Sequence, residues 1–302
     1  MFFVVKAGIV VRLGIAIRQE IVDCGEIWSV RYEQREAGMM EEKQLILMDF
    51  SGVYEEQEFW KDEALSRVDV RGISGCNCYC DGEAYECLME HIREFPAEGI
   101  HFLDSGNYHY MSLLWLKKVQ EPFRLVLFDN HTDMQPPAFG GLLSCGGWAA
   151  EALRVAGGVG GTETGVAEAM LREVILIGPD AEAFSQVEPE IRERVRFLSR
   201  EELCEDSDGL RRFLAEIPGD LPLYLSVDKD VLCPGDACTS WSQGDLRLSE
   251  LEEAVGFLTE QRRVIGMDVC GERDPGENAD GSCNDRANAA LLKLWKKKAT
   301  GK

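Results

Sequence analysis

The fold is indicated most strongly by the stretch Phe123-Arg124-Leu125-Val126-Leu127-Phe128-Asp129-Asn130-His131-Thr132-Asp133, in which a polar motif follows an apolar run. The apolar run predicts a buried strand. Side chains alternate with a period of two, so Asp129, His131 and Asp133 leave the strand on the same side. The chain has only 4 histidines, and one of them stands between these two aspartates. Converging carboxylate and imidazole groups predict a divalent metal site, and hydrolysis is the first hypothesis for function.

The composition limits the classes of partner. The chain of 302 residues is 45% hydrophobic, which is enough for a large α/β core. Its net charge of −22 argues against a nucleic-acid partner, because phosphate binding requires clustered Lys and Arg. The apolar N-terminus is interrupted by Lys6 and Arg12 and is too short to span a membrane. We therefore expect neither a nucleic-acid nor a membrane partner.

The 11 cysteines indicate a reducing compartment. An odd number of thiols without a secretory signal is typical of a cytoplasmic protein. Cys76, Cys78, Cys80 and Cys87 lie close together in the sequence, but C-x-C-x-C-x₆-C is not a standard zinc spacing. Free thiols are the favoured interpretation, and a bound zinc ion or iron–sulfur cluster is the alternative.

Apolar segments of strand length alternate with helical patterns from about residue 43 onward. Strands are predicted at 44–49, 100–103, 124–128, 174–177, 195–198, 223–227 and 264–267. Helices are predicted at 84–95, 108–119, 148–155, 166–171, 181–194, 209–217, 287–298 and, after a Ser249/Glu252 capping box, up to Gln261. This rhythm predicts an α/β fold with a parallel sheet between two helical layers. Residues 1–38 lack this alternation and are expected to be an N-terminal extension of uncertain order or an upstream translation. Residues 39–302 are expected to form one domain.

Other polar residues follow other predicted strands. His109 comes after the strand that ends near Asp104, and Asp228 and Asp230 end the strand through Val227. Asp268 and Glu272 follow the strand through Met267. Functional groups in such sheets collect beyond the carboxyl ends of the strands. An aspartate at a strand end is often only a turn former, but the combination favours a shared site.

These motifs resemble those of the ureohydrolase family, which includes arginases, agmatinases and formiminoglutamases. Ser105-Gly106-Asn107-Tyr108-His109 resembles the family's glycine-rich segment ending in His. Asp129-Asn130-His131-Thr132-Asp133 is similar to its Asp-x-His-x-Asp motif, and Ser226-Val227-Asp228-Lys229-Asp230 to its Ser-x-Asp-x-Asp motif. The resemblance implies an arginase-like three-layer α/β/α fold around a mainly parallel sheet, and a homo-oligomer, because relatives are often trimers or hexamers.

The resemblance also implies two Mn²⁺ ions per chain. One ion is assigned to His109, Asp129, Asp133 and Asp228, and the other to Asp129, His131, Asp228 and Asp230. Oxygen ligands with one imidazole per ion suit Mn²⁺, and a bridged pair gives hydroxide near neutral pH. The implied activity is hydrolysis of a non-peptide C–N bond in a guanidino or related amidino group by that bridging hydroxide.

Two departures from the family concern catalysis. The family's last strand is followed by Asp-x-x-Glu with a Pro three residues on, and here Asp268 to Glu272 has one residue more, although Glu272 keeps its distance from Pro275. Glu272 is predicted to hold the guanidinium. Cys145 stands where arginases have a proton-shuttling His, and it is either a weak acid or an inert buried thiol. The substrate is therefore expected to be another guanidino, formimino or amide compound, or an arginine side chain in a peptide.

Two other function classes remain open. One is a mononuclear, deacetylase-like metal hydrolase on the same fold, and the other is a catalytically silent member with a binding role. A site with one metal needs neither His109 nor Asp230, so these two residues discriminate between one ion and two.

Overall fold

The computed structural model describes residues 45–137, 139–155, 170–206, 208–275 and 281–300, and all of them belong to one compact unit. The predicted extension, residues 1–38, lies outside the described residues, so its boundary stays a prediction. Among the described residues, no helix has the length and apolar character that a membrane span requires.

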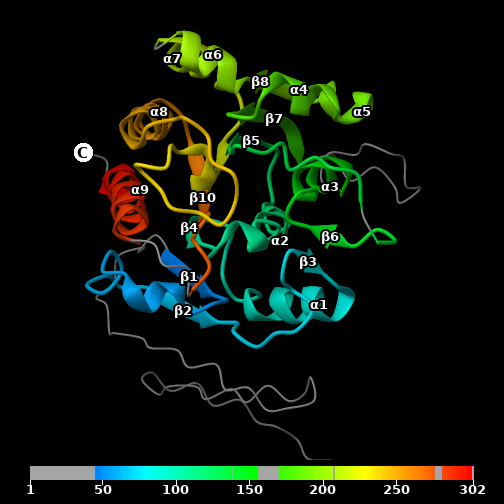
Figure 1. Cartoon of the computed structure of the whole chain (residues 1–302), viewed down its shortest axis with the longest axis vertical. Helices are drawn as coiled ribbons and strands as arrows, with labels where there is room; N and C mark the ends of the chain where they lie inside the picture. Colours follow the sequence, from blue (N-terminus) through cyan, green and yellow to red (C-terminus); the bar gives the residue numbers. More distant parts are fainter. Residues whose placement is uncertain (1–44, 138, 156–169, 207, 276–280, 301–302) are drawn as a thin grey trace, which may run out of the picture. The chain divides into compact units, whose positions relative to one another are not determined.

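The centre of the fold is an 8-stranded sheet in the order β2-β1-β4-β10-β9-β5-β7-β8 (Figure 1). All neighbouring strands in it are parallel. Its strands are β1 (Leu45–Asp49), β2 (Ser66–Asp69), β4 (Gly99–Phe102), β5 (Phe123–Phe128), β7 (Leu171–Ile177), β8 (Val195–Leu198), β9 (Leu223–Asp228) and β10 (Val264–Cys270). The short strands β3 (Tyr79–Cys80) and β6 (Leu143–Ser144) form a separate antiparallel pair.

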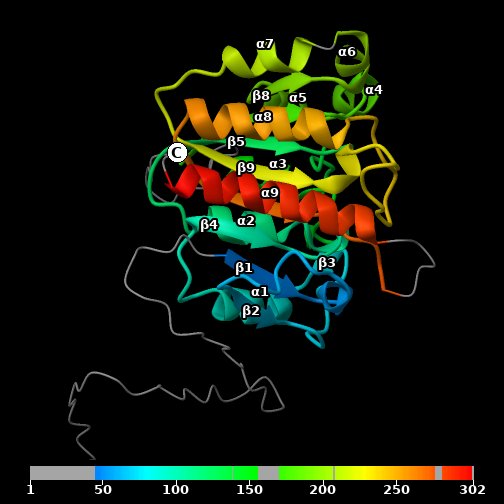
Figure 2. The same ribbon diagram turned by 90° about the vertical axis from the view of Figure 1, so that its left-hand side faces the viewer.

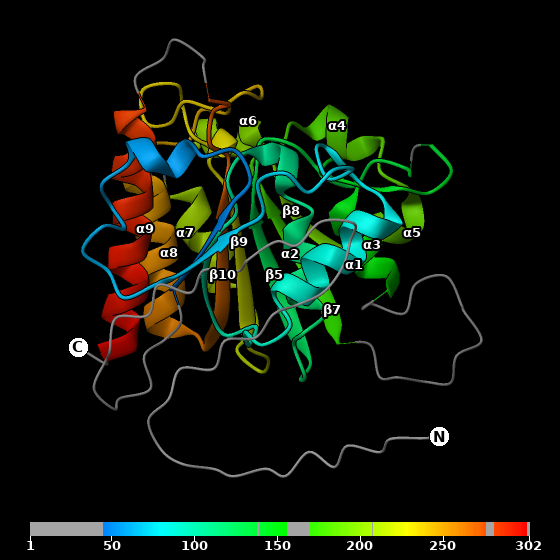
Figure 3. The ribbon, with the colours of Figure 1, turned by 90° about the horizontal axis from the view of Figure 1, so that it is seen from below.

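Helices cover both faces of the sheet: Figure 3 shows the two helical layers on opposite sides of the strands, and Figure 2 looks onto one of them. One apolar core lies under α1 (Gly82–His91), α2 (Met111–Leu116), α3 (Trp148–Val155) and α5 (Pro189–Arg192). The other lies under α7 (Gly209–Ala215), α8 (Leu248–Gln261) and α9 (Ser282–Thr300). Two further helices are α4 (Ala181–Ser185) and α6 (Arg200–Glu205). This arrangement confirms the predicted three-layer α/β fold.

Strand β5 shows why the sheet needs two helical layers. Phe123, Leu125 and Leu127 contribute to the first core, whereas Val126 and Phe128 contribute to the second. Both faces of the strand are therefore apolar, which is the pattern of a parallel strand buried between helices. After Arg124, near the start of the strand, the next polar position is Asp129, just beyond the end of β5.

Several predicted boundaries are wrong. Leu171 was expected to end a helix but begins β7, and the rest of that expected helix, except for residue 170, lies outside the described residues. The helix expected over 181–194 is interrupted before Pro189, which begins α5. The capping interaction of α8 is also shifted, because the Glu250 side chain accepts from the Arg247 N–H at 2.8 Å. Strand β2 and helix α6 were not predicted.

Candidate metal centre

The site lies beyond the carboxyl ends of β4, β10, β9 and β5, which are consecutive neighbours in the sheet. These ends meet at one edge, so the residues that follow them come together although they are far apart in sequence. The six predicted ligands are all found here, in three overlapping groups that could hold a metal ion. The groups are His109/Asp129/Asp133, Asp129/His131/Asp230 and His109/Asp228/Cys270.

The ligand group around His109 is closed to solvent. Its Nδ1 lies 2.9 Å from Asp133, 3.3 Å from Asp129 and 3.4 Å from Asp228, measured to carboxylate oxygens. His109 is 1% exposed. Its other nitrogen, Nε2, lies 2.9 Å from the Ser226 hydroxyl, which fixes the ring with Nδ1 toward the carboxylates. A hydrogen bond on the outer nitrogen is the usual way in which a histidine ligand is oriented.

The ligand group around His131 has the same design in a more open place. Its Nδ1 lies 2.9 Å from Asp230 and 3.5 Å from Asp129. Its Nε2 lies 2.9 Å from the Ser242 hydroxyl. The His131 side chain is 30% exposed. The exposed Trp241 approaches it edge-on, with 5.7 Å between ring centroids.

Local backbone turns place the alternate carboxylates. Asp129 accepts from the N–H of His131 at 2.6 Å, and Asp228 from the N–H of Asp230 at 2.9 Å. Such bonds to a backbone group two residues on form Asx turns, so each motif curls around its own first aspartate. Asp133 has a φ of 50°, in the left-handed region that few non-glycine residues adopt. Its carboxylate accepts from the Trp148 indole at 2.6 Å.

Two carboxylates of the site, Asp228 and Asp230, and both imidazoles have raised pKa values. Burial, together with the charges of Asp230 and Asp129, raises the pKa of Asp228 to about 7. Burial and the charge of Asp129 raise the pKa of Asp230 to about 6. Burial alone would lower the pKa of His131, but Asp129 and Asp230 raise it to about 11. The pKa of His109 is likewise raised, against burial, by Cys270, Asp129 and Asp133. Positive charge stabilises this cluster, which is what a bound cation supplies.

Two buried polar atoms in the site make no hydrogen bond. They are His109 Nδ1 and Asp129 Oδ2, which lie 3.3 Å apart. Leaving such atoms unsatisfied in the interior is costly, and their lone pairs converge with those of Asp133 and Asp228. The residues therefore fit a divalent cation, and the oxygen-rich donor set is of the kind that Mn²⁺ accepts.

Comparison with known proteins agrees with this geometry. The model of the family described as "Arginase family" matches residues 51–291. The chain belongs to the arginase family. An uncharacterized protein of Thermotoga maritima is 30% identical over 251 residues, 82% of this chain and 87% of the relative.

Solved structures share the arginase fold. The formimidoylglutamase of Bacillus subtilis superposes with a TM-score of 0.62 at 15% identity, covering 92% of this chain and 96% of that one. The arginase of Bacillus caldovelox superposes with a TM-score of 0.59 at 15% identity, covering 83% and 97%.

Glu272 belongs to none of the ligand groups and lies in a buried polar cluster. Its carboxylate accepts from Gln57 at 2.8 Å, Asn284 at 2.9 Å and Asn288 at 2.7 Å, and it pairs with the Lys229 ammonium. Glu272 is 1% exposed. The predicted contact with a guanidinium would require the carboxylate to exchange one of these partners for substrate. Sequence reasoning missed the pairing of Lys229 with Glu272, because the two residues are 43 positions apart in the chain.

Counting from Asp268, the family's Asp-x-x-Glu pattern reaches Gly271 rather than Glu272. Gly271 has a φ of 88°, and a Cβ there would lie 2.3 Å from Asp228 Oδ1. A side chain at this position would therefore displace a predicted metal ligand. The additional residue turns the chain so that Glu272 meets Lys229.

Cys145 lies at the border of the His109 group. It is 8% exposed, and burial, followed by the charges of Asp133 and Cys78, raises the pKa of its thiol to about 12. The thiol therefore stays protonated, and its part in catalysis stays a prediction. Among the described residues, no potential ligand group contains Cys76, Cys78, Cys80 or Cys87.

Proposed function

We propose that this protein is a dinuclear, manganese-dependent hydrolase that cleaves a non-peptide C–N bond in a guanidino or related amidino group. One observation carries the proposal. Asp129 belongs both to the ligand group of His109 and to that of His131. A carboxylate shared by two groups is the arrangement that holds two ions side by side, whereas a single ion needs only one of them.

The ligand assignment extends these two groups by Asp228, as the resemblance to the family implies. His109, Asp129, Asp133 and Asp228 would hold one ion, and Asp129, His131, Asp228 and Asp230 the other. Bound there, the pair would supply hydroxide near neutral pH and stabilise charge that develops on the substrate. The protein's own contribution is to fix both rings through Ser226 and Ser242 and to exclude water from the His109 side.

Trp241 is a candidate contact for the cationic end of a substrate. It is 40% exposed beside His131, and its indole donates to Asn107 at 2.9 Å, which fixes the ring. An aromatic face attracts a guanidinium or amidinium by cation–π interaction. This contact supports a substrate that enters from the His131 side. Cys145, whose thiol is protonated, could donate but not accept a proton.

The mononuclear, deacetylase-like alternative needs a single ion and requires neither His109 nor Asp230. With one ion, no ligand would be bound by the converging atoms around His109, and His109 Nδ1 would remain buried without a hydrogen bond. This atom favours two ions over one. A silent family member would bind metal without turnover.

The test is metal loading followed by a substrate panel. Metal-free protein is incubated with MnCl₂, its metal content is measured by mass spectrometry, and release of urea, ammonia, formamide or acetate is followed. The panel contains guanidino, formimino and amide compounds and arginine-containing peptides. We expect about two manganese ions per chain, release of urea, ammonia or formamide, and no activity in Asp129→Asn. One zinc ion per chain with acetate release would sink the proposal, and metal binding without any turnover would favour the silent alternative.

The substrate, the cellular location and the oligomeric state are proposed as follows. The substrate is a small molecule or a peptide side chain that carries a guanidino or amidino group. We place the protein in the cytoplasm, which is supported by its 11 cysteines. We propose a homo-oligomer, and sedimentation analysis of the purified protein would show its mass.

A further inference from the structure

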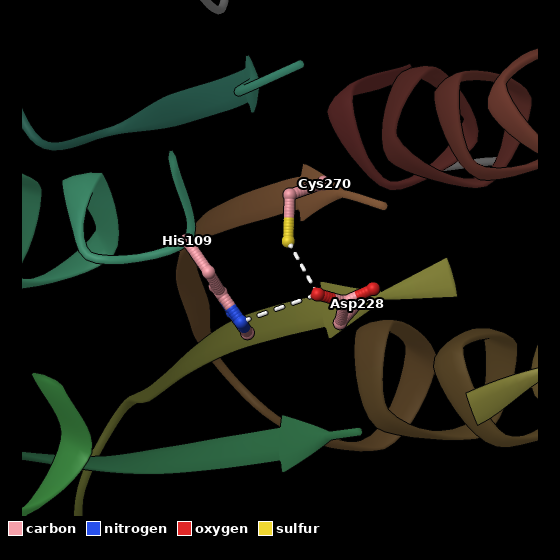
Figure 4. Close-up of side chains that lie close together, drawn as sticks. All are labelled: His109, Asp228 and Cys270. Atoms are coloured by element: carbon pink, nitrogen blue, oxygen red, sulfur yellow. Dashed lines mark hydrogen bonds and ion pairs between the residues drawn. The ribbon is translucent and has the colours of Figure 1, made fainter. Parts of the chain in front are cut away.

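A thiol lies inside the buried part of the metal centre. Cys270 is the last residue of β10 and is 1% exposed. Its Sγ lies 3.2 Å from Asp228 Oδ2, and ligand atoms of Cys270, Asp228 and His109 all lie within 4.8 Å of one another (Figure 4). We propose that Cys270 is a thiolate ligand of the ion held by His109 and Asp228. This inference rests on the proposed metal centre and adds a donor to one half of it.

The position of His109 gives independent support. Its Nδ1 is buried, makes no hydrogen bond and faces the same space as the Cys270 sulfur (Figure 4). Asp129 Oδ2 is equally unsatisfied and lies 3.3 Å from that nitrogen. His109 belongs both to the group with Asp129 and Asp133 and to the group with Asp228 and Cys270, so an ion held by His109 has the thiol among its potential ligands. The cysteine is therefore placed among unsatisfied donors and is not an isolated buried thiol.

The alternative is a thiol that only donates a hydrogen bond to Asp228. Its Sγ lies within hydrogen-bond distance of the Asp228 carboxylate, so the thiol hydrogen would point at that oxygen. Binding an ion would form a sulfur–metal bond with a sulfur lone pair and release the thiol proton to solvent. No oxidant or reductant is needed, and coordinated thiols are deprotonated in this way.

A sulfur ligand changes the preferred metal. Carboxylate and imidazole donors suit Mn²⁺, whereas thiolates select softer ions such as Zn²⁺. The group of His131, Asp129 and Asp230 contains no sulfur. The two halves of the centre should therefore differ in metal preference, with the softer ion on the His109 side. The protein would then be active with a mixed pair, or require manganese in excess over zinc.

Cobalt(II) reports the thiolate directly. Metal-free, full-length protein is titrated with CoCl₂, and sulfur-to-cobalt charge-transfer absorption is recorded in the near ultraviolet. We expect this absorption in the wild type and in Cys145→Ser, a matched control at the border of the same site. We expect it to be absent in Cys270→Ser and Cys270→Ala. The inference is overturned if the absorption persists in both Cys270 variants, or if it is absent from a wild type that binds two cobalt ions. Either result would leave the proposed metal centre itself unaffected.

Zinc binding provides a measurement that needs no variant. X-ray absorption of the zinc-loaded wild type should show a sulfur neighbour at about 2.3 Å. In competition between Zn²⁺ and Mn²⁺, Cys270→Ser should lose on the order of tenfold or more of its zinc preference. A zinc shell without sulfur overturns the inference. If neither cobalt nor zinc binds at all, the proposed function fails with it, so the two failures are distinguishable.

Discussion

The two halves of the metal centre are built alike but in different surroundings. Each has a histidine that presents Nδ1 to carboxylates and holds Nε2 against a serine hydroxyl at 2.9 Å. His109 is 1% exposed, whereas the His131 side chain is 30% exposed beside Trp241. The difference separates two tasks. The closed half anchors an ion where water cannot compete, and the open half leaves room for a substrate.

The largest effects are expected from removing each histidine in turn, because this tests whether the two halves differ as described. Both His109→Ala and His131→Ala are expected to lose activity, because each removes a ligand. His109→Ala should also destabilise the metal-free protein by roughly 3 kcal/mol, since it leaves buried carboxylates without a cationic partner. His131 is more exposed, so water can reach its carboxylate partners after the substitution and the loss of stability should be smaller than for His109→Ala. Urea unfolding of the metal-free variants checks this, and equal losses of stability would contradict the difference in burial.

Acidification should weaken metal binding on both sides of the centre, because the pKa values of both histidines are raised. An ion must displace a proton from His131, whose pKa is about 11, and below about pH 7 a further proton from Asp228. Each displaced proton lowers apparent affinity about tenfold per pH unit, so about 100-fold or more is expected between pH 7.5 and 5.5. Isothermal titration with MnCl₂ at several pH values measures the change. An affinity independent of pH would show that these groups do not bind the metal.

The same pKa shifts predict the opposite trend for the metal-free protein. All four shifts are upward, so the folded state binds more protons than the unfolded state and stability falls as pH rises. The carboxylates contribute between about pH 4 and 7, and the histidines above about pH 6.5. The melting temperature of metal-free protein should fall from pH 5 to 8, and manganese should restore it. A melting temperature that rose with pH would contradict the upward direction of these pKa shifts.

The serines that orient the two rings should have unequal effects. Ser226→Ala removes a buried partner of His109 and should weaken metal binding by about 10–100-fold. Ser242 is exposed, so water can take its place and Ser242→Ala should have a smaller effect. Metal affinities of the two variants give the comparison. A larger effect for Ser242 would indicate that metal affinity depends more on the exposed side of the site, around His131, than on its buried side.

The sequence predicts the sheet better than the short helices. A segment such as 123–128 is apolar on both faces and has no alternative to a buried strand, and the motifs that follow it place the ligands at one edge. Edge elements such as β2 carry polar residues, so tertiary pairing rather than pattern determines them. Cys270 and Lys229 gave no signal, because their roles depend on neighbours more than forty residues away, at Asp228 and Glu272. Only the folded chain brings these pairs together.

Trp241 offers the finest test of the open half. Trp241→Ala should raise KM for a cationic substrate a few-fold, because an exposed cation–π contact is worth about 0.5–1 kcal/mol. Trp241→Phe keeps an aromatic face and should recover most of the loss, whereas neither variant should alter metal content. Steady-state kinetics on the substrate found in the panel separates KM from kcat. A lower KM in Trp241→Ala would mean that the indole obstructs the entrance, and the substrate would then approach from the side of Cys145.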